Sequence, residues 1–209
     1  MFKKVGLILS SITILSGCIL SPVKPININT YQIMPKIKTT ANITPPEKFN
    51  QTLLMPPIIS LAPFNSFSMY YAAKEYQLKP YAFNQWVALP GDMINNSVLF
   101  YLANNGPFSS TIYGGVISNA EYRINLVLNT LVLNLHTPNP MVTLNVSAQL
   151  TNTSNGIIVS KKNFNINMPS SASPDAFVIA ANKATKELAI RVHNWLAEQK
   201  INTPSDKNK

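Results

Sequence analysis

Three consecutive stretches of alternating polarity constrain the fold of this chain more than any other feature. From Val142 to Leu150 every second residue is apolar, and the residues between are Thr, Asn, Ser and Gln. Successive side chains of a strand point to opposite faces of a sheet, so this period predicts a half-buried strand with one wet face. The stretches 122–135 and 157–168 alternate in the same way. Asn155-Gly156 is a hairpin turn signal, so we expect three long antiparallel strands, with a β-bulge at Asn129-Thr130 where the first stretch changes phase.

Two segments carry the signals of helices. Pro90 suits a first helical position, apolar residues then recur on one face, and Asn105-Gly106-Pro107 is a stop signal, which predicts a helix over 90–105. Ser173 can cap a second helix, which is predicted over about 174–198 and has one continuous apolar face.

The upstream half predicts shorter strands. Tyr31 to Met34 is a candidate first strand, and residues 67–72 and 76–83 are expected to form a hairpin. A second apolar run, 53–61, contains two adjacent prolines, which confine a strand to an edge or a bulge. The whole order predicts an α+β fold, a two-layer sandwich of an antiparallel sheet with two helices packed on one face.

The N-terminus has the features of a secretory signal peptide over residues 1–17. A basic start, Lys3-Lys4, precedes an apolar stretch too short to span a bilayer and then two small residues. The ending Leu15-Ser16-Gly17-Cys18 resembles the bacterial lipobox, which implies diacylglycerol on the sulfur of Cys18, cleavage before it, and acylation of the new amine, with palmitate as the expected acyl group. The alternatives are a single-pass anchor and a plain signal peptide with a chance cysteine. We expect residues 18–29 to be the lipidated N-terminus and a proline-containing tether, 30–200 one domain, and 201–209 a disordered tail.

The composition limits the classes of function. The formal charge is +9, which suits anionic lipid or an acidic partner, but no dense basic stripe supports nucleic-acid binding. With a single cysteine, no intramolecular disulfide or thiolate metal cluster can form. No acidic residue lies within four positions of another, and His136 and His193 are best explained as surface or structural residues. We therefore expect no catalytic residue, no cofactor and no metal site.

Six aromatic residues crowd the stretch from Tyr70 to Trp86. Most are expected in the core. Some can instead contact a protein partner or lipid, because Tyr and Trp suit such surfaces. The candidates for partner or lipid contact are Tyr71, Tyr81 and Trp86.

Several short stretches resemble the ABC-type transport auxiliary lipoprotein family in order and spacing, from about Tyr31 to Trp195. One departure is Gln85, where the family tends to have Arg, and another is a proline- and asparagine-rich insertion before residue 53. The matching stretches are Tyr31-Gln32-Ile33, Tyr81-Ala82-Phe83-Asn84-Gln85-Trp86-Val87-Ala88-Leu89-Pro90, Asn105-Gly106-Pro107-Phe108, Ala120-Glu121-Tyr122-Arg123-Ile124, Lys161-Lys162-Asn163-Phe164, and the run from Asp175-Ala176-Phe177 through Ala184 to Trp195-Leu196.

The resemblance implies a noncatalytic accessory in intermembrane lipid transport, anchored in the outer membrane and facing the periplasm. Its partners would be an MCE-domain periplasmic protein and the ATPase and permease of an ABC transporter. Direct contact with phospholipid and homo-oligomerisation stay open. The alternatives are an envelope-assembly lipoprotein, either a lipopolysaccharide-assembly plug or a secretion pilotin that binds an outer-membrane protein, and a periplasmic hydrolase.

Overall fold

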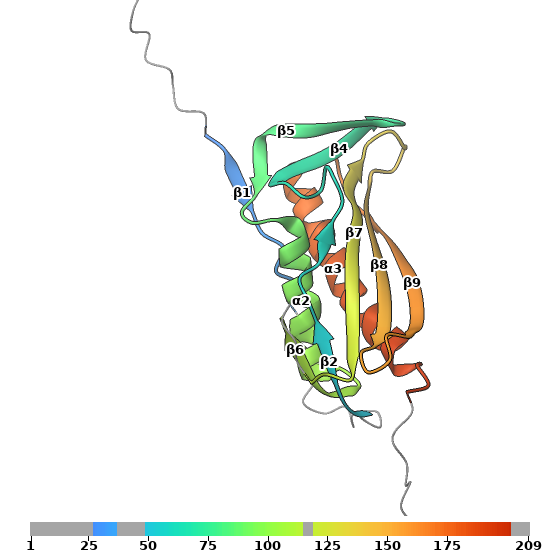
Figure 1. The fold of residues 1–209 in the computed structure, drawn as a ribbon. Coiled ribbons are helices and arrows are strands. Elements are labelled where there is room, and N and C mark those ends of the chain that lie inside the picture. The colour runs from blue at the N-terminus through green and yellow to red at the C-terminus, as the bar shows by residue number, and fades with distance from the viewer. Residues whose placement is uncertain (1–26, 37–48, 115–118, 202–209) are drawn as a thin grey trace, which may run out of the picture.

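The computed structural model describes residues 27–36, 49–114 and 119–201 (Figure 1). They form an α+β fold in which a mixed sheet of nine strands carries two helices on one face (Figure 1). The strands are β1 (Asn29–Tyr31), β2 (Phe49–Met55), β3 (Ile59–Ser60), β4 (Ser68–Lys74), β5 (Gln77–Trp86), β6 (Phe108–Tyr113), β7 (Tyr122–Asn134), β8 (Met141–Asn152) and β9 (Ile158–Pro169), and the helices are α2 (Pro90–Asn105) and α3 (Pro174–Ala197).

Both helices lie where the sequence predicts them. Ser173 caps α3 by accepting a hydrogen bond of 3.2 Å from the backbone N–H of Ala176. The N-terminus of α2 has no such side-chain cap, but Pro90 occupies its first turn and needs no hydrogen-bond acceptor there. At the other end of α2, the backbone N–H of Gly106 donates to the carbonyl oxygen of Leu102 at 2.7 Å.

The three long strands are also confirmed. β7, β8 and β9 pair antiparallel in sequence order, and the register between β7 and β8 shifts between Leu128 and Thr130. The predicted bulge is therefore present. The turn between β8 and β9 uses Gly156 at a φ of 71°, which is a backbone conformation that favours glycine.

The sheet is mixed, so the prediction of an antiparallel sheet is wrong for the upstream strands other than the β4–β5 pair. β2, β3 and β4 follow one another along a single edge of β7, and all three are parallel to it. β2 is also parallel to β6, and β1 is parallel to β5. For β2, β3 and β4 the reason is the position of α2 in the chain, because it lies between these strands and both β6 and β7. A strand, helix, strand connection returns the chain in its original direction and so produces parallel neighbours.

The adjacent prolines 56 and 57 end one strand and precede another, which separates β2 from β3. Of the two expected positions, an edge or a bulge, β2 does not take the edge, because it lies between β6 and β7. β4 and β5 form the predicted hairpin. β6 was not predicted, since only six residues of mixed polarity make it and three of them are Ser or Thr.

The core lies between the inner face of the sheet and the helices. The alternating apolar residues of β8, from Val142 to Leu150, are all at most 4% exposed. Two aromatic pairs join the helix layer to the sheet: Trp86 packs on Phe177 with ring centroids 5.5 Å apart, and Phe164 packs on Trp195 at 6.0 Å. The two predicted apolar faces thus meet as one core.

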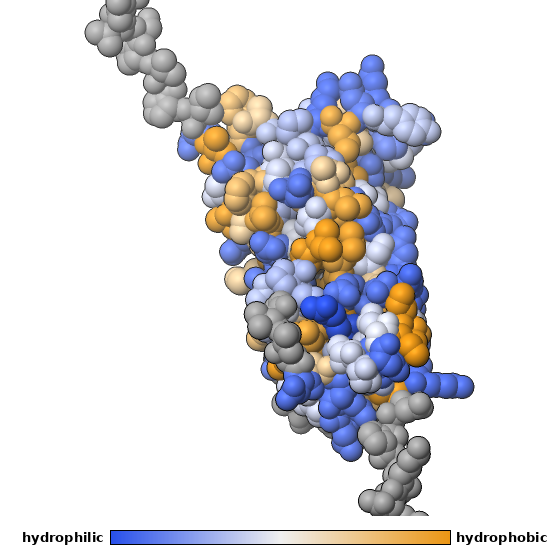
Figure 2. All heavy atoms as spheres, viewed as in Figure 1, coloured by the Kyte–Doolittle hydropathy of each residue, from blue (hydrophilic) through white to orange (hydrophobic). Residues whose placement is uncertain are grey.

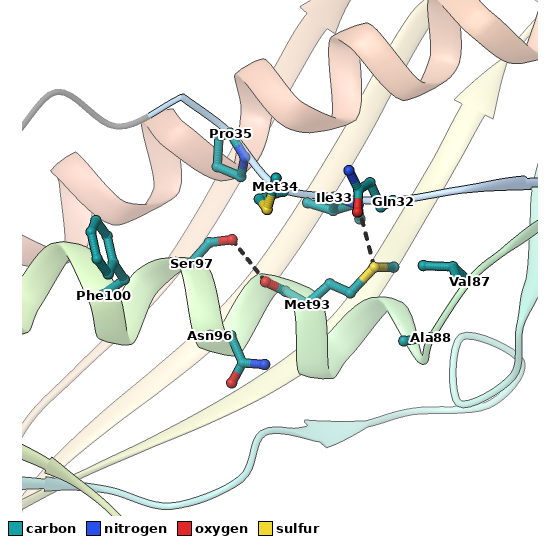
Figure 3. A pocket seen from close by; sticks show the side chains of 10 residues that line it. All are labelled: Gln32, Ile33, Met34, Pro35, Val87, Ala88, Met93, Asn96, Ser97 and Phe100. Atoms are coloured by element: carbon teal, nitrogen blue, oxygen red, sulfur yellow. Dashed lines mark hydrogen bonds between the residues drawn. The ribbon is translucent and has the colours of Figure 1, made fainter.

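The segment that follows β1 does not continue as a strand. The prediction of a strand over Tyr31 to Met34 is wrong except for Tyr31, because β1 ends there and residues 32–36 leave the sheet and run between α2 and α3 (Figure 3). The backbone N–H of Met34 donates to Oδ1 of Asn182 on α3 at 2.8 Å, and the backbone N–H of Ile33 donates to Sδ of Met93 on α2 at 3.3 Å. We call residues 32–36 the strap. The strap adds to the helical layer of the expected two-layer sandwich.

Candidate functional site

A groove of about 510 Å³ lies beside α2, between that helix and the strap (Figure 3). Its volume falls in the range of small-molecule and cofactor sites. The residues that line it come from the strap, from the turn before α2 and from α2 itself: Gln32, Ile33, Met34, Pro35, Val87, Ala88, Met93, Asn96, Ser97 and Phe100.

Parallel pairing of β1 with β5 builds this groove. The register sets Tyr31 opposite Trp86, and the backbone N–H of Val87 donates to the carbonyl oxygen of Tyr31 at 2.8 Å. The residues after each strand therefore run side by side. Asn182 holds the strap on the other side, because its Nδ2 donates to the carbonyl oxygen of Gln32 at 3.2 Å while its Oδ1 accepts from Met34.

The groove is apolar and partly open to solvent. Met34 is 68% exposed, Val87 57% and Phe100 53%, although all three are hydrophobic. The hydroxyl of Ser97 donates to the carbonyl oxygen of Met93 at 2.8 Å, so its hydrogen is used within α2. None of the lining residues is titratable. The groove can bind an apolar surface or chain, but its own side chains offer no general acid or base.

A second hollow, of about 640 Å³, lies on the open face of the sheet and is lined by residues of β3, β7, β8 and β9. Apolar atoms gather over the middle of this face (Figure 2), and Ile59 of β3 is 60% exposed. Polar side chains join neighbouring strands: Nδ2 of Asn129 donates to Oδ1 of Asn145 at 2.8 Å and to Oγ of Ser147 at 2.7 Å. These bonds satisfy polar side chains on the solvent-facing side of the sheet that the alternation predicts.

The three aromatic residues proposed as contacts lie in two environments. Trp86 is 1% exposed and packs on Phe177, so its side chain belongs to the core. Tyr71 of β4 and Tyr81 of β5 are half-buried, and their ring centroids are 4.8 Å apart. The pair lies on the β4–β5 hairpin, and no residue that lines the groove belongs to it.

The hydroxyl of Tyr81 is buried and has no hydrogen-bond partner among the described residues. Burial raises the pKa of Tyr81, and the negative charge that Tyr71 would carry raises it further. Burial likewise raises the pKa of Tyr101 on α2. Neither phenol is thereby made a base or a nucleophile, because a raised pKa keeps the group protonated.

The residues with potential for chemistry are not brought together. His136 is exposed just after β7, whereas His193 of α3 packs against the ring of Tyr101 with centroids 5.9 Å apart. Among the described residues, no cluster of His, Cys, Asp and Glu could hold a metal ion. Neither α2 nor α3 is long and apolar enough to cross a membrane. Cys18, the signal peptide and nearly all of the tail lie outside the described residues.

Sequence reasoning missed the groove, because its three segments meet only through the pairing of β1 with β5. One signal was available. Met93 and Phe100 do not belong to the apolar face on which the helix over 90–105 is predicted, so they mark a second apolar stripe along α2.

Two solved structures share the fold. A protein from Xanthomonas campestris has a TM-score of 0.70 and 17% identity, and the alignment covers 80% of this chain and 93% of that one. Another, an uncharacterized protein, has a TM-score of 0.64 and 11% identity, with 81% of this chain and 99% of that one covered. At these identities the likeness concerns the fold alone. No curated protein sequence matches the chain.

The sequence pattern of a known family matches residues 31–192, which extend from the end of β1 into the last turns of α3. That stretch includes α2, which lines the groove, α3 up to residue 192, and every strand but the first two residues of β1. The family is described as the lipoprotein component that is auxiliary to ABC-type transport. The chain is therefore a member of the ABC-type transport auxiliary lipoprotein component family.

Proposed function

We propose that this protein is a noncatalytic accessory of an ABC/MCE-type intermembrane lipid transport system, anchored by lipid on Cys18 in the outer membrane and facing the periplasm. The observation that carries the proposal is the family match over residues 31–192. The lipobox-like ending before Cys18 supports the anchor. The partners we propose are an MCE-domain periplasmic protein and the subunits of an ABC transporter.

The geometry supports a binding role. The groove beside α2 offers exposed apolar side chains without a titratable neighbour in its lining, which suits contact with an apolar partner surface. Tyr71 and Tyr81 remain proposed contact residues on the β4–β5 hairpin. Trp86 is not exposed for such a contact, because it fixes the end of β5 in the core.

Affinity purification of the full chain from detergent-solubilised envelopes tests this function. We expect MCE-domain and permease subunits to be recovered together with the wild-type protein. Cys18→Ser should remove the lipid, leave the signal peptide uncleaved and shift the protein out of the outer-membrane fraction. Recovery of an outer-membrane barrel or a secretin without transport subunits would instead support the envelope-assembly role and overturn the proposal.

A further inference from the structure

We propose that the β4–β5 hairpin is a second membrane contact, which lays Tyr76 and two flanking lysines on the bilayer surface beside the lipid anchor. The inference rests on the anchor at Cys18 from the proposed function. It adds a contact that the folded domain itself makes with lipid.

Tyr76, at the tip of this hairpin, has an unusual conformation. Its φ is 60°, and no other non-glycine residue in the described part of the chain has a positive φ. Gly, Asn or Asp usually occupies such a position, because a bulky side chain is disfavoured in the left-handed region. The Tyr76 side chain is nevertheless 97% exposed, so packing within the domain does not account for it. A strained residue with a solvent-exposed ring is a reason to look for a ligand outside the domain.

The neighbours of Tyr76 have the chemistry of a membrane surface contact. Leu78 is 44% exposed, and Lys74 and Lys79 are exposed on the two strands of the hairpin. Glu75 is the only acidic residue from 74 to 79. Tyrosine is favoured at the level of lipid headgroups because its ring is apolar and its hydroxyl is polar. Lysines near the surface are attracted to anionic headgroups.

The direction of the chain places this tip on the anchored side. β1 is parallel to the last three residues of β5, so the chain before Asn29 leaves past Asn84, at the end of the molecule across which the rest of β5 runs to the tip (Figure 1). β1 and the β4–β5 hairpin lie at the same end of the molecule, and the turn between β8 and β9 lies at the opposite end (Figure 1). The residues from Cys18 to Asn29 span at most roughly 36–40 Å. A bilayer that holds the anchor is therefore within reach of Tyr76.

A protein partner is the competing occupant of this tip. The shared end with the chain that leads to the anchor favours lipid, because the anchor already fixes the distance to the bilayer. The β8–β9 hairpin supplies a matched control, since Ile157 is a hydrophobic residue that is 61% exposed at the end remote from β1.

The experiment uses the mature lipidated protein in vesicles of phosphatidylethanolamine and phosphatidylglycerol. Cys18 is the only cysteine of the chain, so a lipidated protein offers a single free thiol when Gln77→Cys or Ile157→Cys is introduced. A nitroxide on each position reports its accessibility to a water-soluble nickel relaxant. We expect residue 77 to be several-fold less accessible than residue 157. Replacing phosphatidylglycerol by phosphatidylcholine, or introducing Lys74→Gln with Lys79→Gln, should largely abolish this protection, because each lysine that no longer attracts an anionic headgroup weakens the contact by about fivefold.

Tyr76→Gly in the Gln77→Cys background separates binding from folding. It should raise the midpoint of thermal unfolding, because glycine accepts the positive φ, and at the same time expose residue 77 to the relaxant. Equal accessibility at residues 77 and 157, or protection that survives Tyr76→Gly, would overturn the hairpin contact. Protection that arises only when the purified transport subunits are added would overturn the assignment to lipid.

The outcomes also distinguish this inference from the proposed function. A protein that floats with the vesicles but has an accessible residue 77 retains its anchor and lacks only the hairpin contact. A protein that does not float with the vesicles refutes the anchor and the hairpin contact together. Recovery of transport subunits in the affinity purification does not depend on either result.

Discussion

The backbone N–H of Met34 donates a hydrogen bond of 2.8 Å to Oδ1 of Asn182, a residue 148 positions later in the chain. The same side chain donates to the carbonyl oxygen of Gln32. The side-chain amide of Asn182 therefore accepts from and donates to the backbone of the strap, as the backbone of a neighbouring strand would. One side chain of α3 thus holds the strap that forms a wall of the groove.

Asn182→Ala should loosen the strap. Loss of the two hydrogen bonds is expected to lower the free energy of unfolding by about 1–2 kcal/mol, because both backbone groups are partly or fully open to water. The more specific effect is local, since the amide of Met34 should exchange its hydrogen faster. Hydrogen exchange read by mass spectrometry checks this, with Lys183→Ala as the control on the adjacent exposed position. Unchanged exchange at Met34 in Asn182→Ala would contradict the role of this side chain.

Acidic residues in the groove should prevent binding without unfolding the domain. Met34 and Phe100 are more than half exposed, so Met34→Asp and Phe100→Asp are expected to leave the unfolding midpoint within a few degrees of wild type. Each places a carboxylate in an apolar groove and should reduce recovery of the transport subunits at least severalfold. Ile179→Asp is the matched control, because Ile179 is 58% exposed on α3 and does not line the groove. Equal loss of binding in all three variants would argue against the groove.

Trp86 should matter for stability and not for direct contact. Its ring is 1% exposed and packs on Phe177, so Trp86→Ala is expected to lower the free energy of unfolding by about 3–5 kcal/mol. Phe83→Ala, on the same strand, should have a small effect, because Phe83 is 56% exposed. Chemical denaturation of both variants checks the contrast. Similar decreases in stability would show that the end of β5 is not fixed in the core as described.

Alkaline pH should destabilise the domain through its partly buried tyrosines. The pKa of Tyr81 is raised in the folded state by burial and by Tyr71, so the stability from keeping it neutral is complete below its unfolded pKa of about 10. That stability is lost as the pH rises through the higher pKa of the folded protein. In Tyr81→Phe the unfolding free energy should therefore fall less steeply above pH ~10. Part of the fall should remain, because burial also raises the pKa of Tyr101.

The same variant has a second expected result at neutral pH. Because the Tyr81 hydroxyl has no partner among the described residues, Tyr81→Phe should leave stability unchanged or increase it. Denaturant titrations at pH 8 and above pH 10 measure both effects. A loss of stability at pH 8 would show that the hydroxyl makes a favourable contact in solution.

The helices and the three long strands could be predicted because their signals are local. A cap at Ser173, prolines in the first turns and strict alternation along β8 act over a few residues. The parallel half of the sheet depends on partners far apart in the sequence, such as Leu53 with Tyr122. The position of α2 between the upstream strands and β7 was the available sign of parallel pairing.

The groove could not be predicted, because it combines a strap, a turn and a helix that are separate in the sequence. Local patterns also gave no reason to expect Asn182 to hold the strap, since an asparagine outside the apolar face of a helix usually faces water. For Trp86, the residue type suited a surface contact, but the structure places it in the core. Its partner there is Phe177, 91 positions later in the chain, which no local pattern could indicate.

The short ladder between β1 and β5 also has a mechanical consequence. Any pull on the chain ahead of Asn29 reaches the domain through three paired residues that end at Tyr31, and then through the strap held by Asn182. Because β1 lies along β5, the pull loads the ladder lengthwise, and its hydrogen bonds share the load. Tension strong enough to detach β1 and then the strap would remove the wall of the groove beside α2 and draw Ile33, which is 3% exposed, out of the core.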